Sequence, residues 1–232
     1  MAGAELVASF VTADGARRAF CSRCGSVVPD RALAHDECLL VPAGNLETDP
    51  QIRPEAHWFA ASRAPWFDVD AELRDEQTPA IAGHGAVPAP VHDAAPGRPR
   101  GSCLCGASAY VLEAPPIAVR NCHCTRCRRA RSAAHASNLA TTLDGVRYTR
   151  GEDLLTSYKL PEARFFTQVF CRDCGSPMPR KDRDRGIAIV PMGGFDDEPG
   201  ATPQVHIYVA YKAPWYEIRD RLPQQAEYTP IA

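Results

Sequence analysis

FCRDCGSPMP, residues 170–179, is a segment that the chain contains twice, because FCSRCGSVVP at residues 20–29 repeats its two cysteines, its glycine and its final proline. A Cys-x-x-Cys pair is typical of a zinc site, in which both sulfur atoms bind one ion. A longer match follows each segment, since VPAGNLETDPQIRPEAHWFAASRAPWF at 41–67 aligns without gaps to VPMGGFDDEPGATPQVHIYVAYKAPWY at 190–216. The sequence therefore contains an internal repeat.

The repeat is incomplete, because nothing before Cys21 resembles the segments GSCLCGASAYVLEAPP and CHCTRC that precede residue 128. The first unit thus corresponds to half of a domain, and the second corresponds to the whole domain. Between them, residues 80–100 are dense in Pro, Gly and Ala, which predicts a linker stiffened by proline. We expect a truncated copy at residues 1–79, this linker, and a complete copy at residues 101–232.

Composition and charge narrow the classes of function. The 232 residues include 26 Lys and Arg against 28 Asp and Glu, so no overall basic field favours nucleic acid or an anionic membrane as a partner. The N-terminal sequence has neither the pattern of a signal peptide nor an apolar run of membrane-spanning length, which favours the cytoplasm. In that compartment the ten cysteines are expected to bind metal rather than to form disulfides.

The complete copy is expected to be mainly β, because four runs rich in β-branched and aromatic residues are bounded by turn residues. They are ASAYVLEA (107–114), FFTQVFC (165–171), IAIVPMG (187–193) and VHIYVAY (205–211). One helix is predicted from Thr125 to Leu139, with Thr125 as its N-cap. The cysteine run CHCTRC at 122–127 then lies at the start of a helix, where the dipole and the following arginines favour thiolates.

The complete copy has seven cysteines, and a closed structural zinc site needs four. The spacing favours a closed site that joins a C-x-C pair to the C-x-x-C pair, and it leaves a three-cysteine site with a fourth position open to water or substrate. The four ligands expected for the closed site are Cys103, Cys105, Cys171 and Cys174, and the three expected for the open site are Cys122, Cys124 and Cys127.

Residues 101–229 resemble the glutathione-dependent formaldehyde-activating enzyme family through GSCLCGASAY, CHCTRCRRA, GEDLLTSYKL, FCRDCGSPMP, GGFDDEP and HIYVAYKAPWYEIRDRLP. Residues 8–79 resemble the C-terminal half of the same domain. The resemblance implies a small β-tent-like fold with one short helix, built around a zinc on the four-cysteine set. It also implies a second, more labile zinc on the three-cysteine set, near the place where glutathione binds.

Several residues have two interpretations. Cys21 and Cys24 lack the C-x-C pair that would complete a zinc site, although Cys38 and His35 could substitute for it. His123 lies between alternate ligands and is expected to face away from them. His206 is expected to be structural, since His57 occupies the equivalent place in a copy without the cysteine run. The arginines 126, 128, 129 and 131 are either a solvated helix face or the groups that offset thiolate charge and attract anionic glutathione.

The truncated copy is too small, and lacks too many partners, to fold alone. We expect it to dock through the region around His57 and Trp66. The expected acceptor is the matching face around His206 and Trp215, in a pseudo-dimer within one chain or in a homodimer.

The resemblance and the cysteine pattern together predict a zinc-dependent carbon-sulfur lyase similar to S-(hydroxymethyl)glutathione synthase. Its reactants would be glutathione or a related small thiol and a small electrophile such as formaldehyde, and Cys122, Cys124 and Cys127 would form the catalytic site. The alternatives are a zinc-stabilised binding or scaffold protein without catalysis, and a zinc enzyme that acts on a different thiol adduct or a halide.

Overall fold

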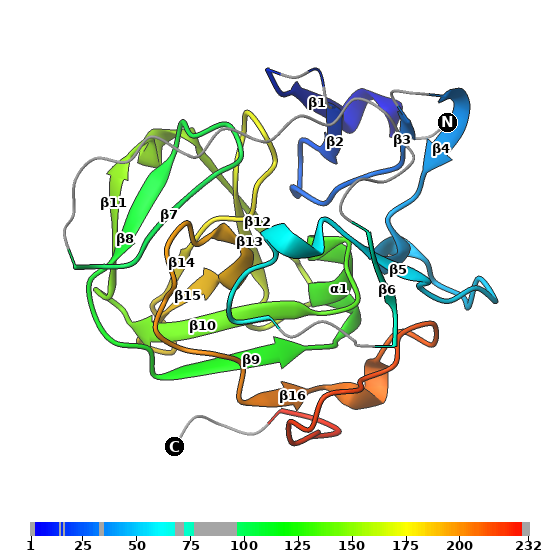
Figure 1. Cartoon of the computed structure of the whole chain (residues 1–232). Coiled ribbons are helices and arrows are strands. Elements are labelled where there is room, and N and C mark those ends of the chain that lie inside the picture. Colours follow the sequence, from blue (N-terminus) through cyan, green and yellow to red (C-terminus); the bar gives the residue numbers. More distant parts are fainter. Residues whose placement is uncertain are drawn as a thin grey trace.

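The computed structural model describes residues 3–13, 15, 17–32, 35–67, 72–76 and 97–228, with the backbone alone for residues 31, 32 and 35–38. These residues form a mainly β structure with one α-helix and several single 3-10 turns (Figure 1), which confirms the predicted fold class. Most of the predicted linker lies outside the described residues. None of the described helices is long and apolar enough to cross a membrane.

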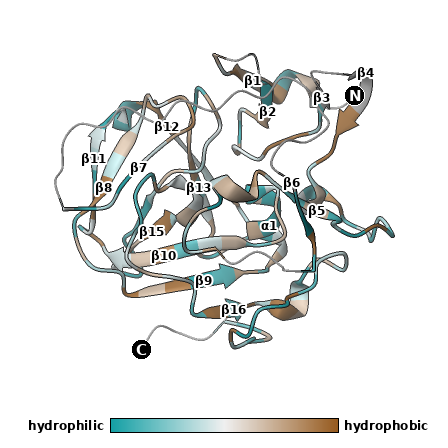
Figure 2. Ribbon diagram, viewed as in Figure 1, coloured by the Kyte–Doolittle hydropathy of each residue, from teal (hydrophilic) through white to brown (hydrophobic). Residues whose placement is uncertain are grey.

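The complete copy is built on a five-stranded sheet. In this sheet β9 and β16 are parallel, and the other neighbouring strands are antiparallel. In spatial order the strands are β14 (Arg180–Asp182), β15 (Ile187–Pro191), β10 (Ala136–Thr142), β9 (Ala118–Cys122) and β16 (Val205–Ile207). Polar and apolar residues are interspersed along these strands, so that each strand contributes to the core and to the surface (Figure 2).

A second sheet and a hairpin close the core. The sheet contains β11 (Val146–Arg150), β8 (Ala109–Leu112) and β7 (Arg100–Ser102), and the hairpin contains β12 (Leu155–Lys159) and β13 (Thr167–Cys171). The core cluster between them includes Tyr110, Leu139 and Met192, all at most 1% exposed. Cys103, Cys171 and Cys174 belong to the same cluster, so the predicted four-cysteine site is part of the hydrophobic core.

The helix α1 (Thr125–Arg131) is shorter than predicted, and its N-cap is Cys124 rather than Thr125. Ser132 has a left-handed backbone conformation with φ 54°, which ends the helix, and residues from Ala136 onward pair with β9 and β15. The prediction of a helix up to Leu139 is wrong because two neighbouring strands offer these small residues a complete set of backbone hydrogen bonds.

Up to the turn η3 (Ala60–Ser62), the truncated copy contains the same kinds of element in the same order as the second half of the complete copy, and its last strand has no counterpart among the described strands. The elements are η1 (Ala4–Leu6), β1 (Val7–Val11), β2 (Arg17–Cys21), β3 (Asp30–Ala32), β4 (His35–Leu40), η2 (Ala43–Asn45), β5 (Ala56–Trp58), η3 (Ala60–Ser62) and β6 (Arg74–Glu76). Their counterparts run from η4 (Glu152–Leu154) through β12–β16, with η5 (Met192–Gly194) and η6 (Val209–Tyr211). Even the left-handed Phe59 and Tyr208, with φ 57° and 59°, match.

The two copies meet at their Cys-x-x-Cys-Gly turns. A Cβ atom on Gly25 would lie 2.6 Å from the ring of Phe170, and one on Gly175 would lie 2.4 Å from the ring of Phe20. Each copy therefore places its phenylalanine ring against the glycine of the other, which is the reciprocal contact of a twofold interface.

Other docking contacts agree with the expectation only in part. Glu72 of the truncated copy forms an ion pair with Arg219, near the expected acceptor residues in the sequence, but Trp66 packs against the core cluster around Tyr110 and the four-cysteine site. The reason is that the missing half of the truncated copy leaves its apolar residues without partners, and the core of the complete copy covers them.

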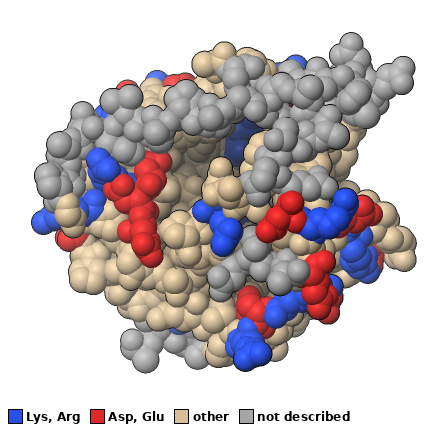
Figure 3. Space-filling model, viewed as in Figure 1, with Lys and Arg blue, Asp and Glu red and all other residues tan. Residues whose placement is uncertain are grey.

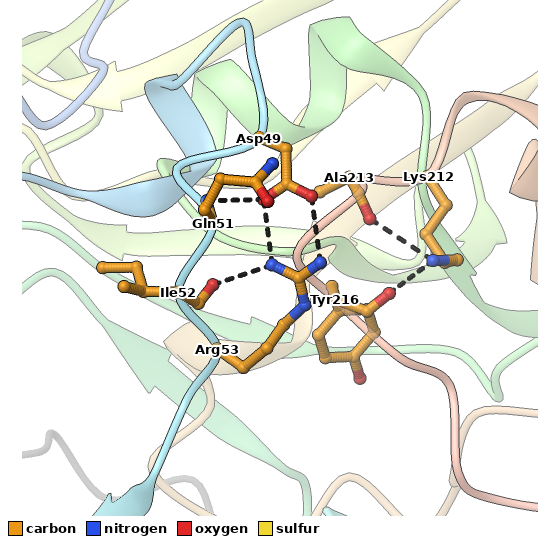
Figure 4. Close-up of polar contacts among 7 residues, drawn as sticks. All are labelled: Asp49, Gln51, Ile52, Arg53, Lys212, Ala213 and Tyr216. Carbon is orange, nitrogen blue, oxygen red and sulfur yellow. Dashed lines mark hydrogen bonds and ion pairs between the residues drawn. The ribbon is translucent and has the colours of Figure 1, made fainter.

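The turn after β2 and the loop after η2 both rest on the end of α1. Ser132 Oγ donates a hydrogen bond of 2.9 Å to the carbonyl of Val27, and Glu47 forms an ion pair of 2.9 Å with Arg129. An ion pair between Asp49 and Arg53 at 2.9 Å stabilises the next turn of the same loop (Figure 4). These contacts fix the truncated copy beside the three-cysteine run.

Replacing Gly25 by Ala is expected to loosen the truncated copy from the complete one. The new methyl group would overlap the Phe170 ring, and the left-handed backbone at φ 75° would add about 1 to 2 kcal/mol of strain. Limited proteolysis of the full chain should show faster cleavage before residue 98. Gly186→Ala is the matched control, since its φ is 66° but no atom lies within 4 Å of the added Cβ. Equal cleavage of both variants would contradict the interface.

Candidate metal centres and the adjoining cavity

Four sulfur atoms meet inside the core of the complete copy. Those of Cys103, Cys105, Cys171 and Cys174 all lie within 4.8 Å of one another and could hold one metal ion. The Cys103–Cys105 and Cys105–Cys171 sulfur distances are 3.4 and 3.8 Å, too long for disulfides, which need about 2 Å. Tetrahedral zinc, with Zn–S bonds of about 2.3 Å, separates its sulfur ligands by about 3.8 Å. The set therefore has the dimensions of a four-thiolate zinc site.

The electrostatics of this set also fit a cation. Hydrogen bonds from Cys103 and Cys171 lower the pKa of Cys174 far below the ordinary value for a thiol. The hydrogen bond with Cys171 lowers the pKa of Cys103, but the hydrogen bond with Cys174 and burial outweigh it and raise this pKa to about 12. Burial raises the pKa of Cys105 to about 11. One thiolate thus suppresses the ionisation of the others, and all four can ionise together only with a cation among them.

The second group is the three-cysteine set of Cys122, Cys124 and Cys127, whose sulfur atoms also lie within 4.8 Å of one another. Cys122 ends β9, Cys124 caps α1, and Cys127 lies in the first turn of the helix. The backbone N–H of Cys127 donates to the sulfur of Cys124 at 3.4 Å, so the helix start holds this sulfur in place. The chain supplies three sulfur ligands here, one fewer than a closed site requires.

Negative charge in the three-cysteine set is concentrated on one sulfur. Hydrogen bonds from Cys122 and Cys127 lower the pKa of Cys124 to about 2, and the hydrogen bond to Cys124 raises the pKa of Cys122 far above its ordinary range. Two of the four arginines that the sequence suggested as partners of the thiolates are Arg128 and Arg131. Arg128 is buried, with 5% of its surface exposed, and burial lowers the pKa of Arg131 to about 10. Both arginines keep their charge at neutral pH and partly balance the thiolates.

Two cavities adjoin the sulfur sets. A cavity of about 1250 Å³ borders Cys103 and Cys105, whose sulfur atoms already have three sulfur neighbours. A cavity of about 690 Å³ borders Cys124, and Arg126 and Arg129 lie in its wall. We take the smaller cavity as the candidate substrate site, because only a three-ligand site has room for a fourth ligand.

The smaller cavity offers aromatic surface and charged groups of both signs. Its lining includes the tyrosines 158, 208 and 211, the arginines 126 and 129, the glutamates 162 and 227, and Gln168. On the face of the molecule drawn in Figure 3, the described Lys and Arg side chains alternate with Asp and Glu side chains. The cavity wall likewise combines two arginines with two glutamates, so neither this face nor the cavity forms a broad basic surface.

A buried chain of histidines runs behind the three-cysteine set, and no pattern in the sequence revealed it. His206 Nε2 lies 2.9 Å from Asp220 Oδ2, and His206 Nδ1 lies 2.8 Å from His123 Nε2. Since a carboxylate only accepts, His206 donates from Nε2 and accepts at Nδ1, so His123 donates from Nε2. His123 belongs to neither sulfur group, and both histidines are fully buried. His206 thus has structural hydrogen bonds, as expected.

Two further rings complete this cluster. Tyr216 stacks on His123 with ring centroids 5.9 Å apart, and His135 lies 5.1 Å from His123. The backbone carbonyl of Tyr216 accepts a hydrogen bond from Lys212 (Figure 4). The cluster joins β9, β10 and β16, and so it supports the end of β9 from which Cys122 projects.

The stability of the protein is expected to fall as pH decreases from 6.5 towards 4. Burial lowers the pKa of His135 to about 4, so the unfolded chain binds a proton in this range that the folded chain does not. His135 alone contributes a slope of up to about 1.4 kcal/mol per pH unit. Urea unfolding of His135→Gln at pH 5.5 and 7.5 should show a smaller difference than the parent. The same pH dependence in both proteins would contradict this assignment.

The cysteines of the truncated copy are not part of either metal group. Cys21 and Cys24 are partly exposed, and within the described side chains they lie in no group of three or more possible ligands. The substitutes that the sequence suggested, Cys38 and His35, have side chains outside the described part of the chain. A zinc site at this turn stays a prediction.

Comparison with known proteins gives a family and similar solved structures. The family model described as glutathione-dependent formaldehyde-activating enzyme matches residues 2–62 and 98–211. A crystal structure of a Rhodobacter sphaeroides protein, a structural genomics target, is 27% identical and covers 45% of this chain and 97% of that chain, with a TM-score of 0.36. None of the curated proteins matches the chain.

Proposed function

Because the chain belongs to the glutathione-dependent formaldehyde-activating enzyme family, we propose that it is a zinc-dependent carbon-sulfur lyase. Its substrates are glutathione or a similar thiol and a small aldehyde such as formaldehyde, which it joins or releases. The observation that carries the proposal is the three-cysteine set, which has a place for a fourth ligand and borders a cavity of about 690 Å³.

The two sulfur sets have different roles in this proposal. Cys103, Cys105, Cys171 and Cys174 would hold a structural zinc, since all four ligand positions are taken by the protein. Cys122, Cys124 and Cys127 would hold a second zinc, which when bound supplies a Lewis acid and stabilises a thiolate. Hydrophobic burial of the first set and the cavity beside the second support this division.

The remaining groups of the cavity would bind and orient the thiol. Arg126 and Arg129 attract its carboxylates, and Gln168 and Tyr208 offer hydrogen bonds at the wall. The buried histidine chain from Asp220 to His123 keeps the end of β9 in place, so that the three sulfur atoms keep their spacing. These residues act by position and charge, and none is required to exchange a proton with the substrate.

The division into a truncated copy at 1–79, a linker at 80–100 and a complete copy at 101–232 is part of the proposal. It is supported by the two separate stretches of the family match and by the equal order of elements in the two copies up to η3. The proposed compartment is the cytoplasm, where a thiol-dependent enzyme with ten cysteines would stay reduced.

Exchange spectroscopy tests the proposed activity directly. Glutathione and formaldehyde equilibrate slowly with their adduct, and two-dimensional NMR measures the rate of interconversion. The zinc-loaded chain is expected to accelerate this interconversion, whereas the chain treated with a chelator is not. An unchanged rate in the presence of the zinc-loaded chain would contradict the proposed reaction and leave the scaffold alternative.

A further inference from the structure

The cavity beside the three-cysteine set is shared by the two copies. Most of its wall comes from the complete copy, but Cys24 and Ser26 come from the truncated copy. Cys24 therefore faces the same space as Cys124. The chain thus brings an additional thiol to the candidate substrate site.

The position of Cys24 is fixed by packing on both sides. Gly25 lies against the Phe170 ring, and the guanidinium of Arg23 lies 5.6 Å above the ring centroid of Tyr158, which is also in the cavity wall. A cation over an aromatic face at this distance is attracted to it. The turn that carries Cys24 is thus fixed at the cavity rather than placed there by chance.

The two equivalent turns differ in what their sulfur atoms do. Cys171 and Cys174 are fully buried, and their sulfur atoms belong to the four-cysteine set. Cys21 and Cys24 occupy the same places in the truncated copy but are partly exposed and, among the described residues, share no group of possible metal ligands. Loss of the C-x-C pair has therefore left a dithiol turn without the two sulfur atoms that would complete a zinc site.

A second observation at this cavity points to a ligand. Gln168 lines the cavity and is 3% exposed, and its carbonyl oxygen accepts a hydrogen bond from Arg131. Its amide nitrogen is buried, and no described residue accepts a hydrogen bond from it. Buried donors are normally satisfied, so a ligand with an oxygen acceptor fits this place. The wall also carries Arg126 and Arg129 together with Glu162 and Glu227, which suits a ligand that bears both carboxylate and ammonium groups, as glutathione does.

We propose that Cys24 and Cys21 form a thiol–disulfide exchange site for a small anionic disulfide, glutathione disulfide being the type. The ligand class rests on the proposed function, since a cavity for an anionic thiol also admits its disulfide. The Cys24 thiolate attacks one sulfur of the ligand, the ligand S–S bond breaks, and one thiolate leaves as a mixed disulfide forms on Cys24. The Cys21 thiolate then attacks the sulfur of Cys24 and displaces the second thiolate.

Electrons and protons balance in this reaction. The protein dithiol loses two electrons and two protons and becomes the Cys21–Cys24 disulfide. The ligand disulfide gains them and becomes two thiols, released beside Cys124. The truncated copy thereby has a chemical role that the complete copy cannot supply, because every described cysteine of the complete copy belongs to one of the two metal groups.

Mass spectrometry of the full zinc-loaded chain with glutathione disulfide tests this inference. In the parent we expect an internal Cys21–Cys24 disulfide and released glutathione. Cys21→Ser should stop at a mixed disulfide on Cys24, and Cys24→Ser should lose both products. Cys38→Ser is the matched control, and it should react as the parent does.

Three results would overturn the inference. One is modification at Cys38 or at metal-ligand cysteines while Cys24 stays reduced, and another is the absence of any product in the parent. The third is loss of a zinc equivalent in Cys24→Ser, which would make the turn a metal site. The proposed lyase is tested separately by adduct interconversion: labelling of Cys24 without that activity would refute the lyase alone, and activity without labelling would refute only this inference.

Discussion

Cys171→Ala is expected to unfold the complete copy and to release the metal of the four-cysteine set. A structural zinc contributes on the order of 10 kcal/mol to folding, which is comparable to the whole stability of a domain. Cys171 is fully buried in the core cluster, so the variant also leaves a gap beside Cys103 and Cys174. Circular dichroism, thermal melting and elemental analysis of the purified variant measure these effects.

Cys21→Ala is the matched control for this experiment. Cys21 has the equivalent place in the truncated copy, with the same hairpin and the same following turn. Its sulfur belongs to no metal group of the described residues, so its loss should change the melting temperature little and the zinc content not at all. If the two variants melt alike, the four-cysteine set is not a structural metal site.

Cys124→Ala is expected to abolish the interconversion of the thiol adduct while the fold and one zinc remain. Removing one of three ligands breaks the proposed catalytic site, but the four-cysteine set lies elsewhere in the core. The variant also loses the cap of α1, at a cost of about 1 kcal/mol. This cost is small beside the effect expected for Cys171→Ala.

Cys124→Ser separates the cap from the ligand. Its hydroxyl can accept the hydrogen bond from the Cys127 backbone, as serine does at many helix starts, but it is a much poorer zinc ligand than a thiolate. We expect it to be as stable as the parent and as inactive as Cys124→Ala. An active Cys124→Ser, or a loss of stability equal to that of Cys171→Ala, would favour a structural role for the three-cysteine set.

Much of the fold follows from local patterns in the sequence. The runs at 107–114, 165–171, 187–193 and 205–211 each contain a strand, because β-branched and aromatic residues favour a half-buried extended chain. The grouping of the seven cysteines followed from their spacing together with the family resemblance, and the sulfur atoms meet in the two expected groups. Metal-binding spacing is informative because nearby ligands constrain the backbone between them.

What could not be predicted depends on contacts between distant segments. The helix after Thr125 stops at Arg131 because the following residues find two strand partners, and propensity alone does not reveal them. The line from Asp220 through His206 to His123 joins positions nearly a hundred residues apart. Likewise, only the docked arrangement places Cys24 in the cavity of the complete copy.

The central claim is that a zinc on Cys122, Cys124 and Cys127 binds the substrate thiol as its fourth ligand. X-ray absorption at the zinc edge, recorded on the full chain with and without glutathione, measures the average number of sulfur ligands per zinc, which together with the zinc content gives the number per chain. We predict two zinc ions per chain and an increase of one sulfur ligand per chain when glutathione is added, absent in Cys124→Ala. One zinc per chain, or a sulfur count that glutathione does not change, would contradict the account.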